Sequence, residues 1–388
     1  MKPVLFILIA AAAGNGVTSS EAAKLTSQAE QLYLQSRYAE AEPIFRQAVE
    51  AWTAQGAEGQ RNRALAMSDL GSLLRALGRY PEAEQALTES LQDLEPGVDA
   101  SRALWNLATL YRTRGELPKA ESCALRAVAM VEGPDRVAPR LVLASIYTEQ
   151  RRYAEAEEIL AWADEGADGA VRVAIYNNIA AIALTTGRYS RAEEFSRKAI
   201  ELGRRALPDQ HPAVAAAWNS LGQARRFQGD YLEAERAYRE SMELWERAVG
   251  ESHPNVARLR MNLGALYHER GRETGAETLF RQAAATFERV YGPDHYLTLV
   301  ARNELADVLR AQRRFTEAEK LSARSLASLE RSFPAGDYRV IQALKNRWRL
   351  LHDSGRGREA ATIANRLRLS SAFAAGPGTA AVRAVDGI

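Results

Sequence analysis

The fold is decided by a stretch that opens with HPAVAAAWNSLGQ at residues 211–223 and runs to Gly336. Two further lines follow at a constant step of 42 residues, HPNVARLRMNLGA at 253–265 and HYLTLVARNELAD at 295–307. The lines align without a gap, and each carries Ala-Glu at the same place, beginning at Ala234, Ala276 and Ala318. A constant period of this size is typical of a repeat architecture.

Each repeat has the pattern of two amphipathic helices. In the unit from His253 to Asp294, the first helix carries apolar residues at helical spacing: Leu259, Leu263, Leu266 and Tyr267. Gly271 then ends this helix, because glycine adopts the left-handed conformation without a Cβ penalty. A second apolar face follows, made of Ala276, Leu279, Phe280, Ala283, Phe287 and Val290. One such hairpin has too little core to fold alone, so the units must stack side by side.

Nine hairpins can be indexed by an alanine of the second helix. These index alanines are Ala41, Ala83, Ala120, Ala156, Ala192, Ala234, Ala276, Ala318 and Ala360. Glycine stands at the turn five residues earlier in six units, at Gly78, Gly115, Gly187, Gly229, Gly271 and Gly355. The sequence therefore predicts an all-α solenoid over residues 21–369, with hairpins at about 21–58, 61–98, 99–134, 135–169, 170–210, 211–252, 253–294, 295–336 and 337–369.

Residues 1–20 have the composition of a secretory signal rather than of a repeat. Lys2 precedes an apolar run from Val4 to Ala13, which ends in a possible A-x-A cleavage site. Because a helix needs about 20 residues to span a bilayer, this run is too short for a membrane span and fits a signal peptide. Cleavage after residue 13 or slightly later would export the protein to the periplasm or the exterior of a bacterium, with no membrane span left. An uncleaved anchor and an apolar start without function are the alternatives.

The end of the array departs from the repeat pattern. Arg347 and Trp348 stand where other units have aliphatic or small residues, as expected of a terminal repeat that exposes one face to water. Residues 337–369 hold eight Lys or Arg against three Asp or Glu, which makes a basic end. Residues 370–388 are rich in Ala, Gly and Pro without a period, so a disordered tail is predicted there.

The sequence carries no catalytic, metal-binding or cofactor signature. It has no Walker-type loop, HExxH, GxSxG or CxxC, and its one cysteine, Cys123, is interpreted as helix packing. His211, His253 and His295 recur at the repeat period. Helices of neighbouring repeats lie about 10 Å apart, too far for a shared zinc ion with ligands at about 2.0–2.1 Å, so these histidines are interpreted as starts of first helices. The net charge of +2 gives no reason to expect nucleic acid as a partner, apart from the basic last unit.

Units such as AAWNSLGQARRFQGDYLEAERAYRESMELWERAVG resemble tetratricopeptide repeats. The 42-residue units that open with His211-Pro212 and His253-Pro254 resemble the kinesin-light-chain type, and the resemblance covers about residues 21–369. It implies a right-handed superhelix whose first helices line a concave groove for a protein or peptide. The family's clamp for C-terminal carboxylates is not matched, because its lysine is missing and Glu304 intrudes.

By this resemblance, two sets of polar residues line the predicted groove. Amides stand fourteen or fifteen residues before the index alanine, at Asn106, Asn177, Asn178, Asn219, Asn262, Asn303 and Asn346. Basic residues stand eight before it, at Arg75, Arg112, Arg226, His268, Arg310 and His352. An amide offers a donor and an acceptor to a peptide unit, and the basic row favours acidic side chains. Trp105 and Phe227 are candidate apolar anchors, with core packing as the alternative for Trp105.

We therefore predict a non-catalytic protein-interaction scaffold that uses no cofactor and binds an extended, acid-leaning segment of a partner in the groove. For the basic row, the alternative is a solubilising face that pairs with acids such as Glu269 or Asp307. For the whole chain, the alternative is a helical accessory or sensor subunit of a separately encoded enzyme or envelope complex.

Overall fold

The structure, a computed structural model, describes residues 18–164, 169–207 and 211–375. The predicted signal segment up to residue 17 and the predicted tail after residue 375 lie outside the described residues. The first helices of the hairpins are α1 (Ser19–Leu34), α3 (Gln60–Ala76), α5 (Val98–Thr113), α7 (Val137–Glu149), α9 (Gly169–Thr185), α11 (Pro212–Phe227), α13 (Pro254–Glu269), α15 (Tyr296–Ala311) and α17 (Tyr338–Asp353). The second helices are α2 (Tyr38–Thr53), α4 (Tyr80–Gln92), α6 (Leu117–Ala129), α8 (Tyr153–Asp164), α10 (Tyr189–Ala206), α12 (Tyr231–Val249), α14 (Glu273–Tyr291), α16 (Phe315–Ser332) and α18 (Gly357–Ala375).

The all-α solenoid of nine hairpins predicted from the sequence is confirmed. Each second helix packs on the first helix of its own hairpin and on that of the next one. Eight of the nine index alanines have no exposed surface, and the ninth, Ala360, is 4% exposed. The index alanine is therefore the point of closest packing in every unit.

Small residues of the first helices let bulky residues of the second helices approach. A Cβ added to Gly222 on α11 would lie 2.6 Å from a ring carbon of Tyr238 on α12. At Gly264 on α13, the added Cβ would lie 3.1 Å from the ring of Phe280 on α14. Tyr238 and Phe280 are fully or almost fully buried, so these glycines allow a large ring to fill the hairpin core.

The turn within each hairpin is made by a residue in the left-handed conformation. The six predicted glycines have positive φ, and in the remaining three turns Ser36, Arg151 and Arg313 take this conformation at φ of 57°, 63° and 60°. A histidine side chain starts the first helix in three units: the Nδ1 atoms of His211, His253 and His295 accept backbone N–H groups at 3.1 to 3.3 Å. The interpretation of these histidines as helix starts is thus confirmed.

The glutamate of the repeated Ala-Glu pair joins each hairpin to the next. It forms an ion pair with an arginine of the following unit at all eight junctions: Glu42–Arg79, Glu84–Arg114, Glu121–Arg152, Glu157–Arg188, Glu193–Arg225, Glu235–Arg272, Glu277–Arg314 and Glu319–Arg356. Glu157 and Glu193 therefore belong to surface ion pairs rather than to an acid–base pair.

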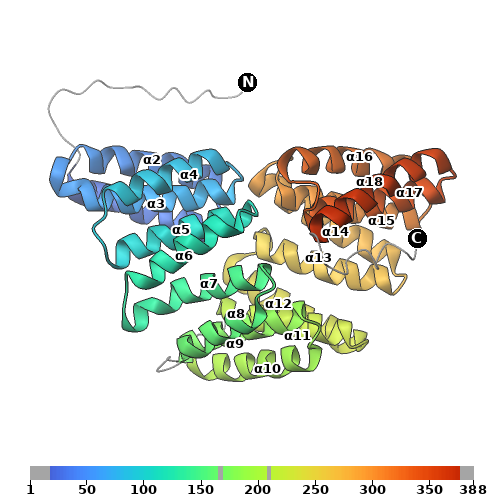
Figure 1. Ribbon diagram of the computed structural model, residues 1–388, viewed down its shortest axis with the longest axis horizontal. Helices are drawn as coiled ribbons and strands as arrows, with labels where there is room; N and C mark the ends of the chain where they lie inside the picture. Colours follow the sequence, from blue (N-terminus) through green and yellow to red (C-terminus); the bar gives the residue numbers. More distant parts are fainter. Residues whose placement is uncertain (1–17, 165–168, 208–210, 376–388) are drawn as a thin grey trace.

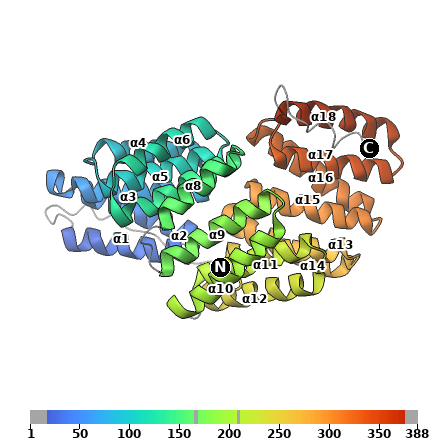
Figure 2. The ribbon, with the colours of Figure 1, turned by 60° about the horizontal axis from the view of Figure 1, so that its bottom comes forward.

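The stack curves so that the first helices face inward. Successive first helices such as α3, α5, α7 and α9 contact one another along the inner side, whereas successive second helices diverge on the outside. Figure 1 shows one broad turn, with the first hairpins in blue and the last in red at the top and α9–α12 at the bottom. Figure 2 shows α1–α8 and α13–α18 as two arms joined by α9–α12.

The two arms touch each other across this turn, and we call the point of touch the closing contact. Tyr38 at the start of α2 stacks on Tyr291 at the end of α14, with ring centroids 5.9 Å apart. Tyr291 stacks in turn on His295, with centroids 4.4 Å apart. A Cβ added to Gly78, between α3 and α4, would lie 3.1 Å from His295 Cδ2. The first and second hairpins are thereby fixed against the seventh and eighth (Figure 1).

The last helix extends further than the sequence predicts. The solenoid boundary predicted at residue 369 is too early, because α18 continues to Ala375. Leu367 is fully buried and Ser370 is 6% exposed, so packing holds the helix past the predicted boundary. In the last unit Arg347 pairs with Glu319 at 3.0 Å, and Trp348 stacks on His352.

Candidate peptide-binding groove

Of the residues predicted to line the groove, twelve lie on first helices from α3 to α15 and are partly or fully buried, whereas on α17 Asn346 is buried and His352 is exposed. Arg75 lies on α3; Trp105, Asn106 and Arg112 on α5; Asn177 and Asn178 on α9; Asn219 and Arg226 on α11; Asn262 and His268 on α13; Asn303 and Arg310 on α15. They follow the concave side of the turn from one arm to the other. The helical spacing chosen from the sequence therefore selects side chains of one continuous face.

The amides of this face connect neighbouring first helices. Asn262 Nδ2 on α13 donates to Asn219 Oδ1 on α11 at 2.7 Å. Asn106 Nδ2 donates to Ser68 Oγ on α3 at 3.1 Å, and Asn177 Nδ2 donates to the carbonyl of Ala213 at 2.9 Å. These bonds use one donor or acceptor of each amide within the chain.

Some polar atoms of the face keep no partner. The Oδ1 atoms of Asn177 and Asn303 are buried and accept no hydrogen bond from the described residues. A buried acceptor without a partner costs about 1–3 kcal/mol, unless a ligand or water supplies the missing donor. Because both oxygens are buried, the N–H of a bound segment could reach them only if neighbouring side chains moved aside.

The basic row is largely neutralised by acids of the same face. Arg112 pairs with Glu149 at 3.1 Å, and Arg226 Nε donates to Glu269 at 2.7 Å. Arg310 donates to Asp307 at 2.6 Å and to Asp353 at 2.5 Å. The alternative drawn from the sequence, in which these residues pair with acids such as Glu269 and Asp307, describes their geometry in the free protein.

His268 is held between two carboxylates. Its Nε2 lies 3.3 Å from Asp307 Oδ2, and its Nδ1 lies 2.7 Å from Glu273 Oε2. The hydrogen bond to Asp307, and then that to Glu273, raise the pKa of His268 to about 9. The side chain is therefore a cation at neutral pH and links α13 to α15.

Arg75 differs from the rest of the row, because no carboxylate of the described residues forms an ion pair with it. Its Nε is buried without a hydrogen-bond partner, and it lies beside the phenol of Tyr33. Because no carboxylate neutralises it, this guanidinium is suited to a carboxylate of a ligand.

Two acids of the same face are held partly protonated by their surroundings. Burial raises the pKa of Glu304 on α15 to about 7, helped by the negative charge of Asp307. Burial likewise raises the pKa of Asp69 on α3 to about 6, although Arg102 pairs with it at 2.5 Å. Asp69 was missed in the sequence, although it stands at the register of the asparagines.

The two predicted anchors differ in exposure. Phe227 is 51% exposed and stacks on Tyr189 with ring centroids 5.0 Å apart. Trp105 is partly buried and packs against the core of the first arm. Phe227 therefore offers apolar surface to a ligand, whereas much of Trp105 belongs to the core.

Within the described ranges, no three His, Cys, Asp or Glu side chains come together as a metal site. The helices of residues 18–164, 169–207 and 211–375 also include none with the length and apolar character to cross a bilayer. Cys123 is buried, and its burial raises the pKa of the thiol.

Comparison with known proteins identifies the repeats. One profile of the tetratricopeptide repeat matches residues 20–95, 171–241, 214–288 and 262–331, and a second profile of the same repeat matches 68–137 and 106–170. The chain belongs to the tetratricopeptide-repeat family. No curated protein matches the sequence.

Solved structures place this repeat protein among helical solenoids. A Rap protein complexed with Competence and Sporulation Factor is 16% identical over 88% of this chain and 100% of that chain, with a TM-score of 0.52. The quorum sensor NprR of B. thuringiensis is 12% identical over 80% of this chain and 87% of that chain, with a TM-score of 0.54. The kinesin-light-chain repeats of Podosopora anserina are 19% identical over 52% of this chain and 96% of that chain, with a TM-score of 0.44.

Proposed function

We propose that this repeat protein is a non-catalytic scaffold that binds an extended, acid-leaning segment of a partner protein along its concave face. The observation that carries the proposal is the set of unpartnered polar atoms on that face: Asn177 Oδ1, Asn303 Oδ1 and the Nε atoms of Arg75 and Arg112. Two carbonyl oxygens suit backbone N–H groups of a bound chain, and Arg75 suits a carboxylate. The fold is shared with a Rap protein that was crystallised in complex with Competence and Sporulation Factor, which supports a binding role for this solenoid.

Binding by this face should be weak for a short segment. The paired arginines gain little from a ligand carboxylate, because each new ion pair replaces one that already exists. The gain is limited to the unpartnered groups and to the exposed ring of Phe227. We expect micromolar affinity, and we expect the preference for acidic segments to depend on Arg75.

The experiment is capture of partners from the native host by the purified protein, followed by titration of the captured segment. Arg75→Glu should reduce its affinity at least tenfold. The control is Arg236→Glu, because the side chain of Arg236 is 70% exposed on α12 of the outer surface. Equal affinity of Arg75→Glu and the unchanged protein would remove the concave face as the binding site.

We propose in addition that residues 1–20 direct export. Helix α1 begins at Ser19, inside this segment, where Thr18 caps it and exchanges hydrogen bonds with Glu21 in a capping box, so the export signal would have to end before Thr18. Cleavage after Ala13 would leave this cap intact. N-terminal sequencing of the protein from its native host tests the proposal, and an intact Met1 on most molecules would contradict it.

A further inference from the structure

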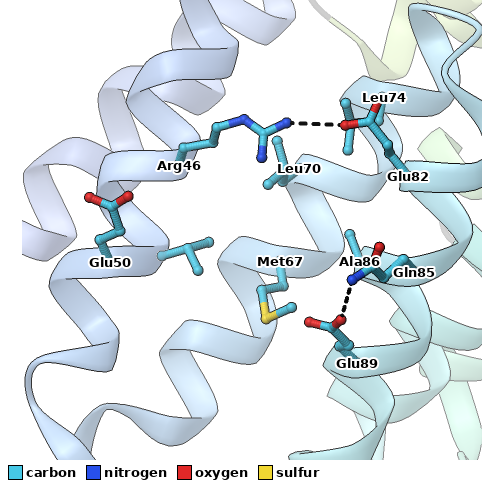
Figure 3. A pocket seen from close by; sticks show the side chains of 10 residues that line it. Arg46, Glu50, Met67, Leu70, Leu74, Glu82, Gln85, Ala86 and Glu89 are labelled. Carbon is cyan, nitrogen blue, oxygen red and sulfur yellow. Dashed lines mark hydrogen bonds and ion pairs between the residues drawn. The ribbon is translucent and has the colours of Figure 1, made fainter.

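A second surface lies on the outside of the first arm, where α2 and α4 diverge above α3. The hollow between them has a volume of about 260 Å³. Figure 3 shows its wall on α2 with Arg46 and Glu50, its floor on α3 with Met67, Leu70 and Leu74, and its wall on α4 with Glu82, Gln85, Ala86 and Glu89. We call this hollow the outer groove. None of the predicted groove residues lines it.

The outer groove is open because Ala86 is small. The third residue after the index alanine is large and apolar in six other units, at Ile44, Ile159, Phe195, Leu279, Leu321 and Ile363, and it is small in the third and sixth hairpins, at Cys123 and Ala237. A side chain of that size would reach into the space between the second helices. With alanine in this place, the floor residues Met67 and Leu70 are each 6% exposed at the bottom of the hollow.

The two ends of the outer groove differ in charge. At one end Arg46 bridges the walls, because it pairs with Glu82 across the groove at 3.5 Å and with Glu42 on its own helix at 2.9 Å. Towards the other end Glu50 on α2 and Glu89 on α4 stand on opposite walls, and Glu89 lies beside Met67 (Figure 3). Glu89 accepts a hydrogen bond from Gln85 at 2.8 Å, and neither carboxylate pairs with a cation of the described residues. The open end therefore carries two uncompensated negative charges.

Size and polarity together define the chemistry that fits. An apolar cavity of about 150 Å³ binds benzene, so the outer groove has room for one large aliphatic or aromatic side chain. A carboxylate on either side of that side chain favours Lys or Arg close to it in sequence. Acidic segments, which suit Arg75 on the concave face, would be repelled here.

We propose that the outer groove binds a basic segment of a second protein, with a Leu or Phe side chain on Met67 and Leu70 and flanking Lys or Arg residues on Glu50 and Glu89. The site is separate from the concave face, so the solenoid holds two segments of opposite charge on opposite surfaces. Its existence does not depend on the function proposed for the concave face.

The test uses the full chain and a fluorescein-labelled peptide, Gly-Lys-Lys-Leu-Phe-Lys-Lys-Leu-Gly, followed by fluorescence anisotropy. The same peptide with Glu in place of every Lys is the probe control; any binding of it belongs to the concave face, so Ala86→Leu should leave that binding unchanged. Ala86→Leu fills the groove with the residue found at Leu279 and Leu321 and should weaken binding at least tenfold. Glu50→Lys with Glu89→Lys reverses the charge of the open end and should weaken binding by as much without filling the floor.

A charge-matched control comes from the sixth hairpin. Glu240 and Glu243 on α12 stand at the repeat positions of Glu89 and Glu50, so Glu240→Lys with Glu243→Lys changes the net charge equally and should leave the affinity within twofold. An equal loss of affinity in this control would show that overall surface charge alone holds the peptide, and would overturn the proposal. Unchanged affinity of Ala86→Leu would also overturn it. A tenfold gain on deletion of residues 1–17 would mean that the chain's own N-terminal segment occupies the groove, which contradicts a partner protein as the occupant.

Discussion

Replacing Gly78 with alanine should loosen the closing contact between the two arms. Gly78 has φ of +77°, and Gly115, the equivalent turn residue of the next hairpin, has φ of +78°. An alanine in this conformation costs about 1–2 kcal/mol at either place. A Cβ at Gly115 would meet no atom within 4 Å, whereas a Cβ at Gly78 would lie 3.1 Å from His295 Cδ2. The difference between the two variants therefore isolates the contact across the turn from the strain of the backbone.

The size of this difference follows from the surroundings of His295. The ring is 8% exposed and lies between Tyr291 and Tyr296, with centroid distances of 4.4 and 4.7 Å. It therefore has little room to move away from a new methyl group. Overpacking of this kind costs about 1–3 kcal/mol, and each 1.4 kcal/mol is a factor of about ten in an equilibrium. We expect Gly78→Ala to raise the fraction of open molecules by about 5-fold to 100-fold relative to Gly115→Ala.

The opening can be measured as a distance between spin labels on the two arms. Labels at Ala39→Cys on α2 and Pro293→Cys beyond α14 occupy exposed positions next to the contact, and Cys123, which is buried, is replaced by alanine. Pulsed electron–electron resonance should give one short distance for Gly115→Ala and an added long component for Gly78→Ala. Identical distance distributions in the two variants would refute the reasoning, because the contact would then contribute no free energy to the closed shape.

Three further predictions concern single side chains. Burial lowers the pKa of His295 to about 4, below the usual value of about 6.5. Its contribution of about 3 kcal/mol to the free energy of unfolding is therefore complete above pH 6.5 and is lost as the pH falls towards 4. Urea unfolding from pH 7 to 4.5 should show this loss, and His295→Asn, which keeps a helix cap, should make the free energy of unfolding less dependent on pH. The pKa of His268 is raised to about 9, so the stability it contributes is present below pH 6.5 and lost as the pH rises to 9; His268→Gln should remove this alkaline loss. Glu277→Gln breaks the ion pair with Arg314 at the junction between α14 and α15–α16 and should lower hydrogen-exchange protection by about 1 kcal/mol. The control is Glu233→Gln, which breaks an exposed contact with Arg236 at 3.8 Å and should change protection by less than about 0.5 kcal/mol.

The repeat unit could be predicted from the sequence because its decisive interactions are local. Ala234 or Ala276 and the glycine at the preceding turn make their contacts within one hairpin, and the same contacts recur in each repeat along the chain. One partner of each junction ion pair could be predicted as well, since a glutamate follows the index alanine in the first eight hairpins. The arginine that pairs with this glutamate usually stands four residues before the next index alanine, as Arg79, Arg188 and Arg314 do.

The closing contact could not be predicted in this way. Tyr38 and Tyr291 belong to the first and seventh hairpins, and their meeting depends on the small rotation between units added over six junctions. The three successive steps between the index alanines Ala83, Ala120, Ala156 and Ala192 are shortened to 37, 36 and 36 residues, and no local rule gives their rotation. The outer groove could not be predicted from the sequence for a different reason. One alanine in place of a larger residue does not change the repeat pattern.

The state of the basic row decides how a ligand of the concave face must bind. Arg226 already holds Glu269, and Arg310 already holds Asp307 and Asp353, so a ligand that approaches these residues must exchange one partner for another. Such an exchange yields little free energy. Net affinity then comes from Arg75 on α3, Asn177 on α9 and Asn303 on α15, the groups that keep unpartnered atoms.

These three groups lie on both arms and on the helices that join them, so a segment that contacts all three must cross the hollow between the arms. The closing contact fixes the separation of α3 and α15, since Gly78 follows α3 and His295 precedes α15. Gly78→Ala should therefore weaken a ligand that bridges the arms, while a basic peptide in the outer groove, which contacts only α2, α3 and α4, should bind as before. Equal loss of both ligands would show that the variant damages the first arm as a whole.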